Sequence, residues 1–137
     1  MLIVFEGLDQ SGKETQAGLL RARLEQEGRR VQYLSFPEYD TPIGTEIRHA
    51  LNGMRDFSPD VMQLLYVANR LEFKARLEQW LQAGDTVVCD RYCASTVAYG
   101  EAQGLDSNWL VEIQRYLPKP DVTVLLDIAP DTAARRK

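Results

Sequence analysis

The sequence predicts an α/β fold in which a parallel β-sheet is flanked by helices. Short apolar runs that are typical of buried strands alternate with longer helical stretches along the chain. Strands covered on both faces are apolar at nearly every position, so this alternation favours a parallel sheet. The chain has 137 residues, which is the size of one domain with a single core. We therefore expect one domain over residues 1–137.

Four short runs rich in Val, Ile and Leu predict the strands, over residues 2–6, 31–36, 86–89 and 122–127. Helices fill the intervals. The first covers residues 13–27, and Gly28 follows it as a C-terminal cap would. Thr41 before Pro42 and Ser58 before Pro59 are start signals for the next two helices.

The helix that starts at residue 59 is expected to run to residue 83, which makes it about 36 Å long. A short helix after Arg91, another over residues 107–117 and one that begins at Pro130 complete the pattern. This last helix has barely begun where the sequence stops, so we expect the chain to be a fragment.

Composition excludes several classes of protein. Apolar residues make up 45% and charged residues 26%, which excludes disordered and fibrous chains. The net charge of −4 argues against binding a nucleic-acid polymer. Cys89, Cys93 and the single His49 do not form a zinc pattern, so we expect reduced thiols and a cytoplasmic protein. No run is long enough for a membrane span or a signal peptide.

The strongest motif lies between the first strand and the first helix. Residues 7–13 read GLDQSGK and match the G-x-x-x-x-G-K pattern of a phosphate-binding loop. Glycines let the backbone curl so that its N–H groups face an anion, and the helix start adds positive charge. Lys13 is expected to reach the outer phosphates. The predicted ATP-binding residues are Gly7, Leu8, Asp9, Gln10, Ser11, Gly12, Lys13, Glu14 and Thr15.

A magnesium site is predicted at the same edge of the sheet. Asp90 ends the third strand, and ligands of open α/β sheets bind at the carboxyl ends of the strands. In folds with a phosphate-binding loop, a carboxylate there holds Mg²⁺, and Arg91 beside it could clamp a phosphate. Glu14 stands where the pattern has Ser or Thr, and its carboxylate is also a hard oxygen ligand. We expect Asp90 and Glu14 as metal ligands, and Lys13, Arg91 and Asp90 as catalytic residues.

These motifs resemble the P-loop kinases of nucleoside monophosphates, and within them the thymidylate kinase family. The matching stretches read FEGLD at residues 5–9, SFP at 35–37, LLYVANR at 64–70, DRY at 90–92, LPKPD at 117–121 and LLD at 125–127. The resemblance implies a three-layer P-loop NTPase fold and transfer of the γ-phosphoryl group of ATP to dTMP, with Mg²⁺. It also implies a homodimer packed through helices.

The resemblance assigns roles on the dTMP side. Asp9 matches the carboxylate that accepts a hydrogen bond from the 3′-hydroxyl, and Arg48 and Arg91 match arginines on the dTMP phosphate. Tyr66 matches an aromatic residue that stacks on thymine, and Arg70 an arginine that bonds a thymine carbonyl. Because they are four residues apart on a helix, Tyr66 and Arg70 share one face. The full predicted set is Asp9, Phe36, Pro37, Arg48, Tyr66, Arg70, Arg91, Ser95 and Tyr99.

The resemblance also implies that the sequence stops before the mobile lid and the last strand of such kinases. We therefore expect a single P-loop kinase domain, residues 1–137, that lacks these parts and has low activity itself. One alternative is a kinase of another small nucleotide or nucleoside. A second is a nucleotide-binding fragment without catalysis, which Glu14 and the missing lid make plausible.

Overall fold

The computed structural model describes residues 1–137, which form two compact units. Unit 1 comprises Met1–Ser35, Leu77–Arg91 and Lys119–Lys137, and unit 2 comprises Phe36–Arg76 and Tyr92–Pro118. Unit 1 contains the whole β-sheet and unit 2 is helical. The chain passes back and forth between the units, so each is built from segments distant in the sequence.

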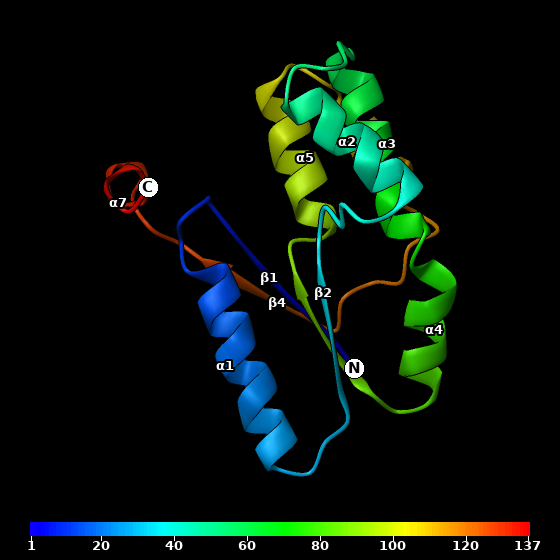
Figure 1. The fold of residues 1–137 in the computed structure, drawn as a ribbon, viewed down its shortest axis with the longest axis vertical. Coiled ribbons are helices and arrows are strands. Elements are labelled where there is room, and N and C mark those ends of the chain that lie inside the picture. The colour runs from blue at the N-terminus through cyan, green and yellow to red at the C-terminus, as the bar shows by residue number, and fades with distance from the viewer. The chain divides into compact units, whose positions relative to one another are not determined.

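The sheet of unit 1 has four strands, all parallel. They are β1 (Leu2–Gly7), β2 (Val31–Ser35), β3 (Thr86–Asp90) and β4 (Val122–Leu126), in the order β2-β3-β1-β4 (Figure 1). Phe5 of β1 pairs with Asp90 of β3, and Gly7 pairs with Leu126 of β4. The predicted strands and their parallel pairing are confirmed, as is the α/β fold class.

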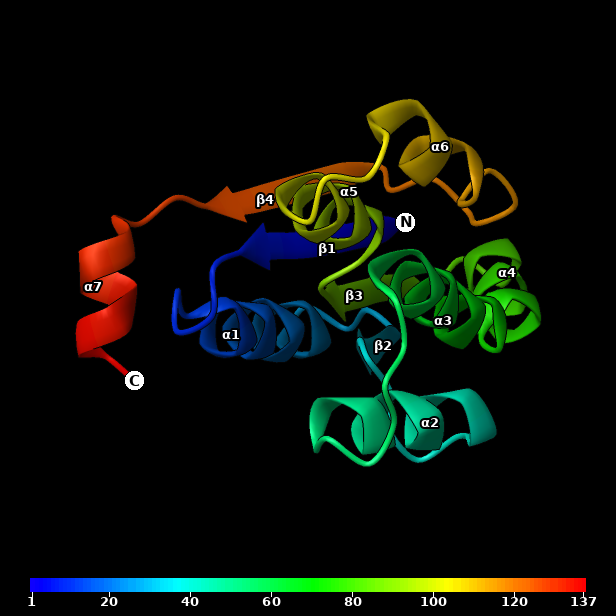
Figure 2. The same cartoon turned by 90° about the horizontal axis from the view of Figure 1, so that it is seen from above.

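One face of the sheet is covered by α1 (Lys13–Gln26), which runs alongside β1 (Figure 2). Ala17 of this helix is buried against Phe5 and Val88, and these side chains form the centre of an apolar cluster. Burying the side chains of Phe5 and Val88 contributes about 1.5–3 kcal/mol each. The last helix, α7 (Pro130–Arg135), lies beyond the end of β4 (Figure 2).

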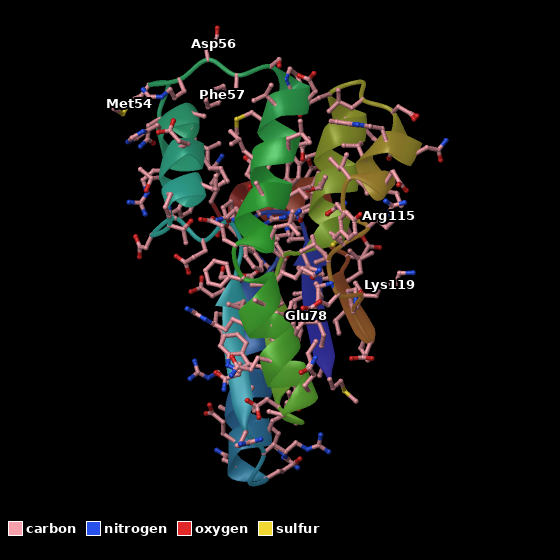
Figure 3. The ribbon with its side chains drawn as sticks, turned by 90° about the vertical axis from the view of Figure 1, so that its right-hand side faces the viewer. Met54, Asp56, Phe57, Glu78, Arg115 and Lys119 are labelled. Atoms are coloured by element: carbon pink, nitrogen blue, oxygen red, sulfur yellow. The ribbon has the colours of Figure 1, made fainter.

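Unit 2 contains α2 (Pro42–Leu51), α3 (Pro59–Leu71), α5 (Cys93–Ala102) and α6 (Ser107–Glu112). A further helix, α4 (Lys74–Gln82), begins in unit 2 and continues into unit 1. Met54, Asp56 and Phe57 lie in the loop that joins α2 to α3 (Figure 3). No helix combines the length and the apolar character that crossing a membrane requires.

The prediction of one helix over residues 59–83 is wrong, because the chain breaks between α3 and α4. The Phe73 N–H donates to the carbonyl of Arg70 at 3.0 Å, a tight three-residue turn that ends α3. The Phe73 ring meets the Phe36 ring edge-on with 5.7 Å between centroids. The break between α3 and α4 is thus accompanied by a contact with Phe36, which is distant in the sequence. The hydrophobic periodicity of residues 59–83 gives no sign of this contact.

Both predicted helix starts are confirmed, since α2 begins at Pro42 and α3 at Pro59, but only one of them is capped by its hydroxyl. Thr41 caps α2 as predicted, since its hydroxyl accepts from the Gly44 N–H at 2.9 Å. Ser58 makes no capping bond, and its hydroxyl contacts the Asp60 carboxylate instead. Asp60 in turn accepts from the Val61 N–H at 2.9 Å. The helix predicted over residues 107–117 is also shorter than expected, because α6 ends at Glu112.

The contact of α2 with the preceding loop predicts opposite effects for two helical glycines. In Gly44→Ala the new Cβ would lie 1.8 Å from the Glu38 carbonyl oxygen, so backbone must move. We expect a loss of about 1–3 kcal/mol in the free energy of unfolding, measured by urea denaturation. Gly18 of α1 has open space around its Cβ position, so Gly18→Ala is the control and should gain about 0.5–1 kcal/mol. Equal effects at both positions would contradict this packing.

Candidate phosphate-binding and nucleotide-binding residues

The predicted phosphate-binding loop is a tight turn between β1 and α1. The Ser11 N–H donates to the Leu8 carbonyl at 3.1 Å, and α1 begins when the Gln16 N–H donates to the Gly12 carbonyl at 3.0 Å. Gln10 has a φ of 63° and Gly12 a φ of 96°, so the backbone here curls through the left-handed region. A curled backbone at a helix N-terminus directs successive N–H groups toward an anion.

Gly7 is required because the loop passes close to the end of β4. Its φ is 150°, and an added Cβ would lie 2.7 Å from the Leu126 carbonyl oxygen and 2.9 Å from the Ser11 hydroxyl. Side chains larger than hydrogen therefore do not fit without moving backbone. The glycine lets the loop turn back tightly toward α1.

Lys13 is folded back into the loop. Its ammonium donates to the Leu8 carbonyl at 2.7 Å, and the residue is buried although it is charged. Burial lowers the pKa of the Lys13 ammonium, and the nearby Arg91 charge lowers it further, while Asp90, Asp9 and Glu6 oppose the shift. An anionic phosphate at the loop would give this ammonium a second partner.

Asp90 stands at the carboxyl end of β3, opposite Phe5 of β1 and Ser35 of β2. One carboxylate oxygen, Oδ1, is buried and has no hydrogen-bond partner. Burial raises the pKa of Asp90, while the charges of Lys13 and Arg91 oppose that rise. Mg²⁺ in nucleotide enzymes is commonly bound by one or two carboxylates together with substrate phosphates. A buried carboxylate oxygen without a protein partner fits that donor set.

Arg91 adopts a φ of 64°, which is unusual for a residue with a side chain. Its N–H donates to the Phe5 carbonyl at 2.9 Å, and its carbonyl accepts from the buried Cys89 thiol at 3.2 Å. The guanidinium forms an ion pair with the Asp9 carboxylate of the loop. The predicted residues Asp9, Lys13, Asp90 and Arg91 therefore lie together at one edge of the sheet.

Glu14 and Thr15 occupy the first turn of α1, and both are exposed. Thr15 lines an open pocket of about 520 Å³ beside the loop. The pocket is also lined by residues that are not among the predicted site residues, namely Gln16, Leu125, Leu126, Asp127, Ile128 and Arg136, although residues 125–127 carry part of the family resemblance. Asp127 follows β4 as Asp90 ends β3, so the rule that selected Asp90 could have found it. Arg136 comes from α7 and has no motif that marks it.

Unit 2 brings several predicted dTMP-binding residues to α3 and its neighbours. Tyr66 is half-buried on α3, and Arg70 lies one turn later and is buried. The Arg70 guanidinium donates to the Thr96 hydroxyl at 2.7 Å and to the Gln114 side chain at 3.1 Å. Phe36 is buried between Phe73 and Tyr92 and is joined to Pro37 by a cis peptide bond.

The remaining predicted residues of unit 2 lie on α2 and α5. Arg48 is exposed on α2, with its guanidinium 5.1 Å from the centre of the Tyr39 ring and 3.6 Å from Asp40. Ser95 is buried and Tyr99 exposed on α5, the helix that also carries the Arg70 partner Thr96. The placement of Arg48 beside Tyr66 and Arg70 stays a prediction.

The family model for thymidylate kinase matches residues 5–137 of the chain. The thymidylate kinase of Schizosaccharomyces pombe is 38% identical over 135 residues, and that of Plasmodium falciparum is 41% identical over 135 residues. Each alignment covers 98% of this chain and 64% of the relative. The chain therefore spans less than two thirds of the length of these relatives.

Solved structures give the same relationship. The thymidylate kinase of Candida albicans matches with a TM-score of 0.81 and 33% identity, over 99% of this chain and 66% of that one. The thymidylate kinase of Ehrlichia chaffeensis matches with a TM-score of 0.84 and 29% identity, over 99% of this chain and 81% of that one. The similarity in sequence and in structure thus extends over almost the whole chain.

The close approach at Gly7 predicts a selective loss of nucleotide binding. In Gly7→Ala the new Cβ would press on the Leu126 carbonyl and the Ser11 hydroxyl, so the loop must shift. We expect ATP to bind at least about tenfold more weakly by calorimetry, since each 1.4 kcal/mol is tenfold in affinity. Gly84→Ala is the control, because Gly84 also has a positive φ but open space around its Cβ position. Unchanged ATP affinity in Gly7→Ala would contradict the assignment of the loop.

Proposed function

The chain belongs to the thymidylate kinase family, and we propose that the protein transfers the γ-phosphoryl group of ATP to dTMP, giving dTDP and ADP. This reaction is a step toward dTTP. The observation that carries the proposal is the grouping of Lys13, Asp90, Arg91 and Asp9 at the carboxyl edge of one parallel sheet. Two cations and a curled loop of N–H groups there suit a polyphosphate better than any uncharged ligand.

The donor nucleotide is assigned to unit 1. The loop from Gly7 to Gly12 would surround the phosphates with N–H groups, and Lys13 would exchange the Leu8 carbonyl for a phosphate oxygen. The open pocket beside Ser11 and Thr15 provides room for more of the nucleotide than its phosphates. Glu14 belongs to this set by its place at the start of α1.

Asp90 and Glu14 are the proposed ligands of Mg²⁺. Asp90 is favoured because its buried Oδ1 has no protein partner, whereas Glu14 is exposed to solvent. When bound by these residues, Mg²⁺ would neutralise the charge that develops on the phosphates during transfer. Lys13 and Arg91 supply further positive charge from the protein itself.

The acceptor nucleotide is assigned to residues by their match to the family. In unit 2, Tyr66 would stack on the base and Arg70 would bond a carbonyl of the base, with Phe36, Pro37, Ser95 and Tyr99 around it. The same match assigns Asp9 as the acceptor for the 3′-hydroxyl, and Arg48 and Arg91 as arginines for the dTMP phosphate. Bidentate arginine contacts suit a phosphate that must be held in one orientation.

Catalysis then rests on positioning and on charge neutralisation. The dTMP phosphate oxygen attacks the γ-phosphorus of ATP, the bond to the β-phosphate oxygen breaks, and ADP leaves. The attacking oxygen is already ionised, so no general base is needed. Holding both phosphates in line replaces an encounter in solution by a reaction within one complex.

Two alternatives remain within this chemistry. The Candida albicans relative is described as having a broad substrate specificity, so a wider range of acceptors is one alternative. A competition assay with dTMP, dUMP and dCMP would distinguish it by which monophosphate consumes ATP first. The other alternative, a nucleotide-binding fragment, predicts binding of ATP without any formation of dTDP.

We also propose a single P-loop kinase domain over residues 1–137 that acts as a homodimer in the cytoplasm, with neither a nucleic-acid polymer nor a membrane as partner. Exposed apolar side chains on α3, namely Val61, Leu64 and Leu71, support a helix-packed dimer. Cys89 and Cys93 are both present as thiols, which supports a reducing compartment. Analytical ultracentrifugation would test the dimer.

Lys13 provides the direct test of the proposed reaction. We expect Lys13→Ala to lower dTDP formation by about a hundredfold or more, because it removes a preorganised charge from the phosphates. ADP release with ATP and dTMP as substrates measures the rate. Lys119→Ala is the control, since Lys119 is an exposed lysine of unit 1 that precedes the start of β4, whereas the loop follows the opposite, carboxyl end of the parallel strand β1. Equal rates in both variants, with both folded by circular dichroism, would refute the assignment.

The two proposed metal ligands can be separated by their dependence on Mg²⁺. We expect Asp90→Asn to raise the half-saturating Mg²⁺ concentration about tenfold, as removal of a metal-supporting group commonly does. Glu14→Gln should change it about twofold at most, because the exposed carboxylate is well solvated. A larger effect at Glu14 than at Asp90 would reverse the assignment.

A further inference from the structure

A buried amide in unit 2 joins two segments that are distant in the sequence. The Asn69 side chain is 0% exposed. Its Oδ1 accepts from the Glu38 N–H at 2.8 Å, and its Nδ2 donates to the Glu38 carbonyl at 2.9 Å. The amide therefore holds both backbone groups of Glu38, as a neighbouring β-strand would.

The same amide meets two side chains. Its Nδ2 lies 3.2 Å from the Thr41 hydroxyl and 3.0 Å from the Glu72 carboxylate. The Thr41 hydroxyl donates to Glu72 at 2.7 Å and accepts from the Gly44 N–H, which starts α2. An amide nitrogen has only two N–H groups, and here three acceptors share them. Asn69 thus has no donor left for a substrate, and any effect on binding must act through its partners.

The partners of Asn69 surround residues assigned to the acceptor nucleotide. Asn69 follows Tyr66 by three residues and precedes Arg70 on α3, whereas Glu38 directly follows Phe36 and Pro37. Thr41 caps α2, the helix that carries Arg48. A single buried side chain therefore connects the three segments that carry these residues. The close approach of Gly44 to the Glu38 carbonyl leaves little room for another arrangement.

We propose that Asn69 is a positioning residue that fixes the loop at Phe36–Pro37 and the start of α2 to α3. Without this clamp the three segments are no longer fixed relative to one another, so the residues that would enclose dTMP are displaced although none of them is altered. The inference rests on the proposed function, because it takes dTMP as the ligand of these segments. The donor nucleotide is assigned to unit 1, so its binding should not depend on Asn69.

The test is Asn69→Asp, which keeps the shape and the acceptor for the Glu38 N–H but replaces the donor with a second acceptor. Its new oxygen would face the Glu38 carbonyl and the Glu72 carboxylate, which repel it. We expect the Kd for dTMP to rise about tenfold by calorimetry, because a buried polar group without a partner destabilises the arrangement that binds dTMP by an amount of this order. The Kd for ATP should stay within about twofold, because the substitution alters no contact of the phosphate-binding loop.

A charge swap separates positioning from general damage. In Asn69→Asp with Glu72→Gln, the glutamine amide can donate to the new aspartate, so dTMP should bind more tightly than in Asn69→Asp alone. Glu72→Gln alone should bind dTMP like the unaltered protein. If Asn69→Asp does not fold, the double variant is compared with Glu72→Gln. The double variant should then bind dTMP somewhat more weakly than Glu72→Gln, by less than about tenfold. Asn108→Asp is the matched control, since Asn108 is an exposed asparagine of α6.

The outcomes are distinct. Selective loss of dTMP binding in Asn69→Asp, with recovery in the double variant, supports the inference. Equal loss of dTMP and ATP binding overturns it, because a clamp within unit 2 should leave ATP binding unchanged. No recovery in the double variant also overturns it, because restoring the hydrogen bond should restore the clamp. If the unaltered protein binds ATP but no dTMP, the proposed function fails and this inference with it. If it binds dTMP and Asn69→Asp binds dTMP equally well, only this inference fails.

Discussion

The register of β1 against β3 is the constraint on which the phosphate site depends. Phe5 pairs with Asp90, and the Arg91 N–H continues this ladder by donating to the Phe5 carbonyl at 2.9 Å. The loop after β1 and the carboxylate that ends β3 therefore emerge at one edge of the sheet. Asp90 also shares a sheet face with Val88, two residues earlier, and that face is covered by α1. A shift of one residue would turn the carboxylate to the opposite face.

The protein itself supplies charge balance at this edge. Lys13 uses the Leu8 carbonyl as its partner, and Arg91 pairs with Asp9. Each cation thus has an internal partner that a phosphate could replace. The shifts in pKa follow the same logic, because burial disfavours the charge on both Lys13 and Asp90, while the opposite charge nearby partly restores it. An anion that binds at this edge would replace these internal partners of Lys13 and Arg91.

In unit 2, by contrast, the buried polar side chains hydrogen-bond to other groups of the protein. Arg70 is buried and bonded to Thr96 and Gln114, and Asn69 is bonded to Glu38 and Glu72. Buried polar groups cost free energy unless they are hydrogen-bonded, so a complete network fixes one arrangement strongly. Neighbouring positions on α3 can thereby serve separate purposes. Arg70 is oriented from α5, and Asn69 ties α3 to the loop before α2.

The predictions that succeeded depend on short segments, and those that failed depend on distant contacts. The strands, the loop at residues 7–13 and the cap at Thr41 are written in local patterns of apolar residues, glycine and hydroxyl groups. The break after α3 is not local, because Phe73 packs on Phe36 and Glu72 accepts from Thr41. Likewise, Ser58 has the residue type of a cap but bonds Asp60, a choice that residue type alone does not reveal.

The order of strands and helices along the chain, the phosphate-binding loop and the family follow from the sequence alone, because each is carried by adjacent residues. The positive φ of Arg91, the buried Asp90 oxygen without a partner and the bonds of Asn69 to Glu38 are visible only in the folded chain. These features arise where chain segments far apart in the sequence meet. Their bonds depend on distances that no local pattern specifies.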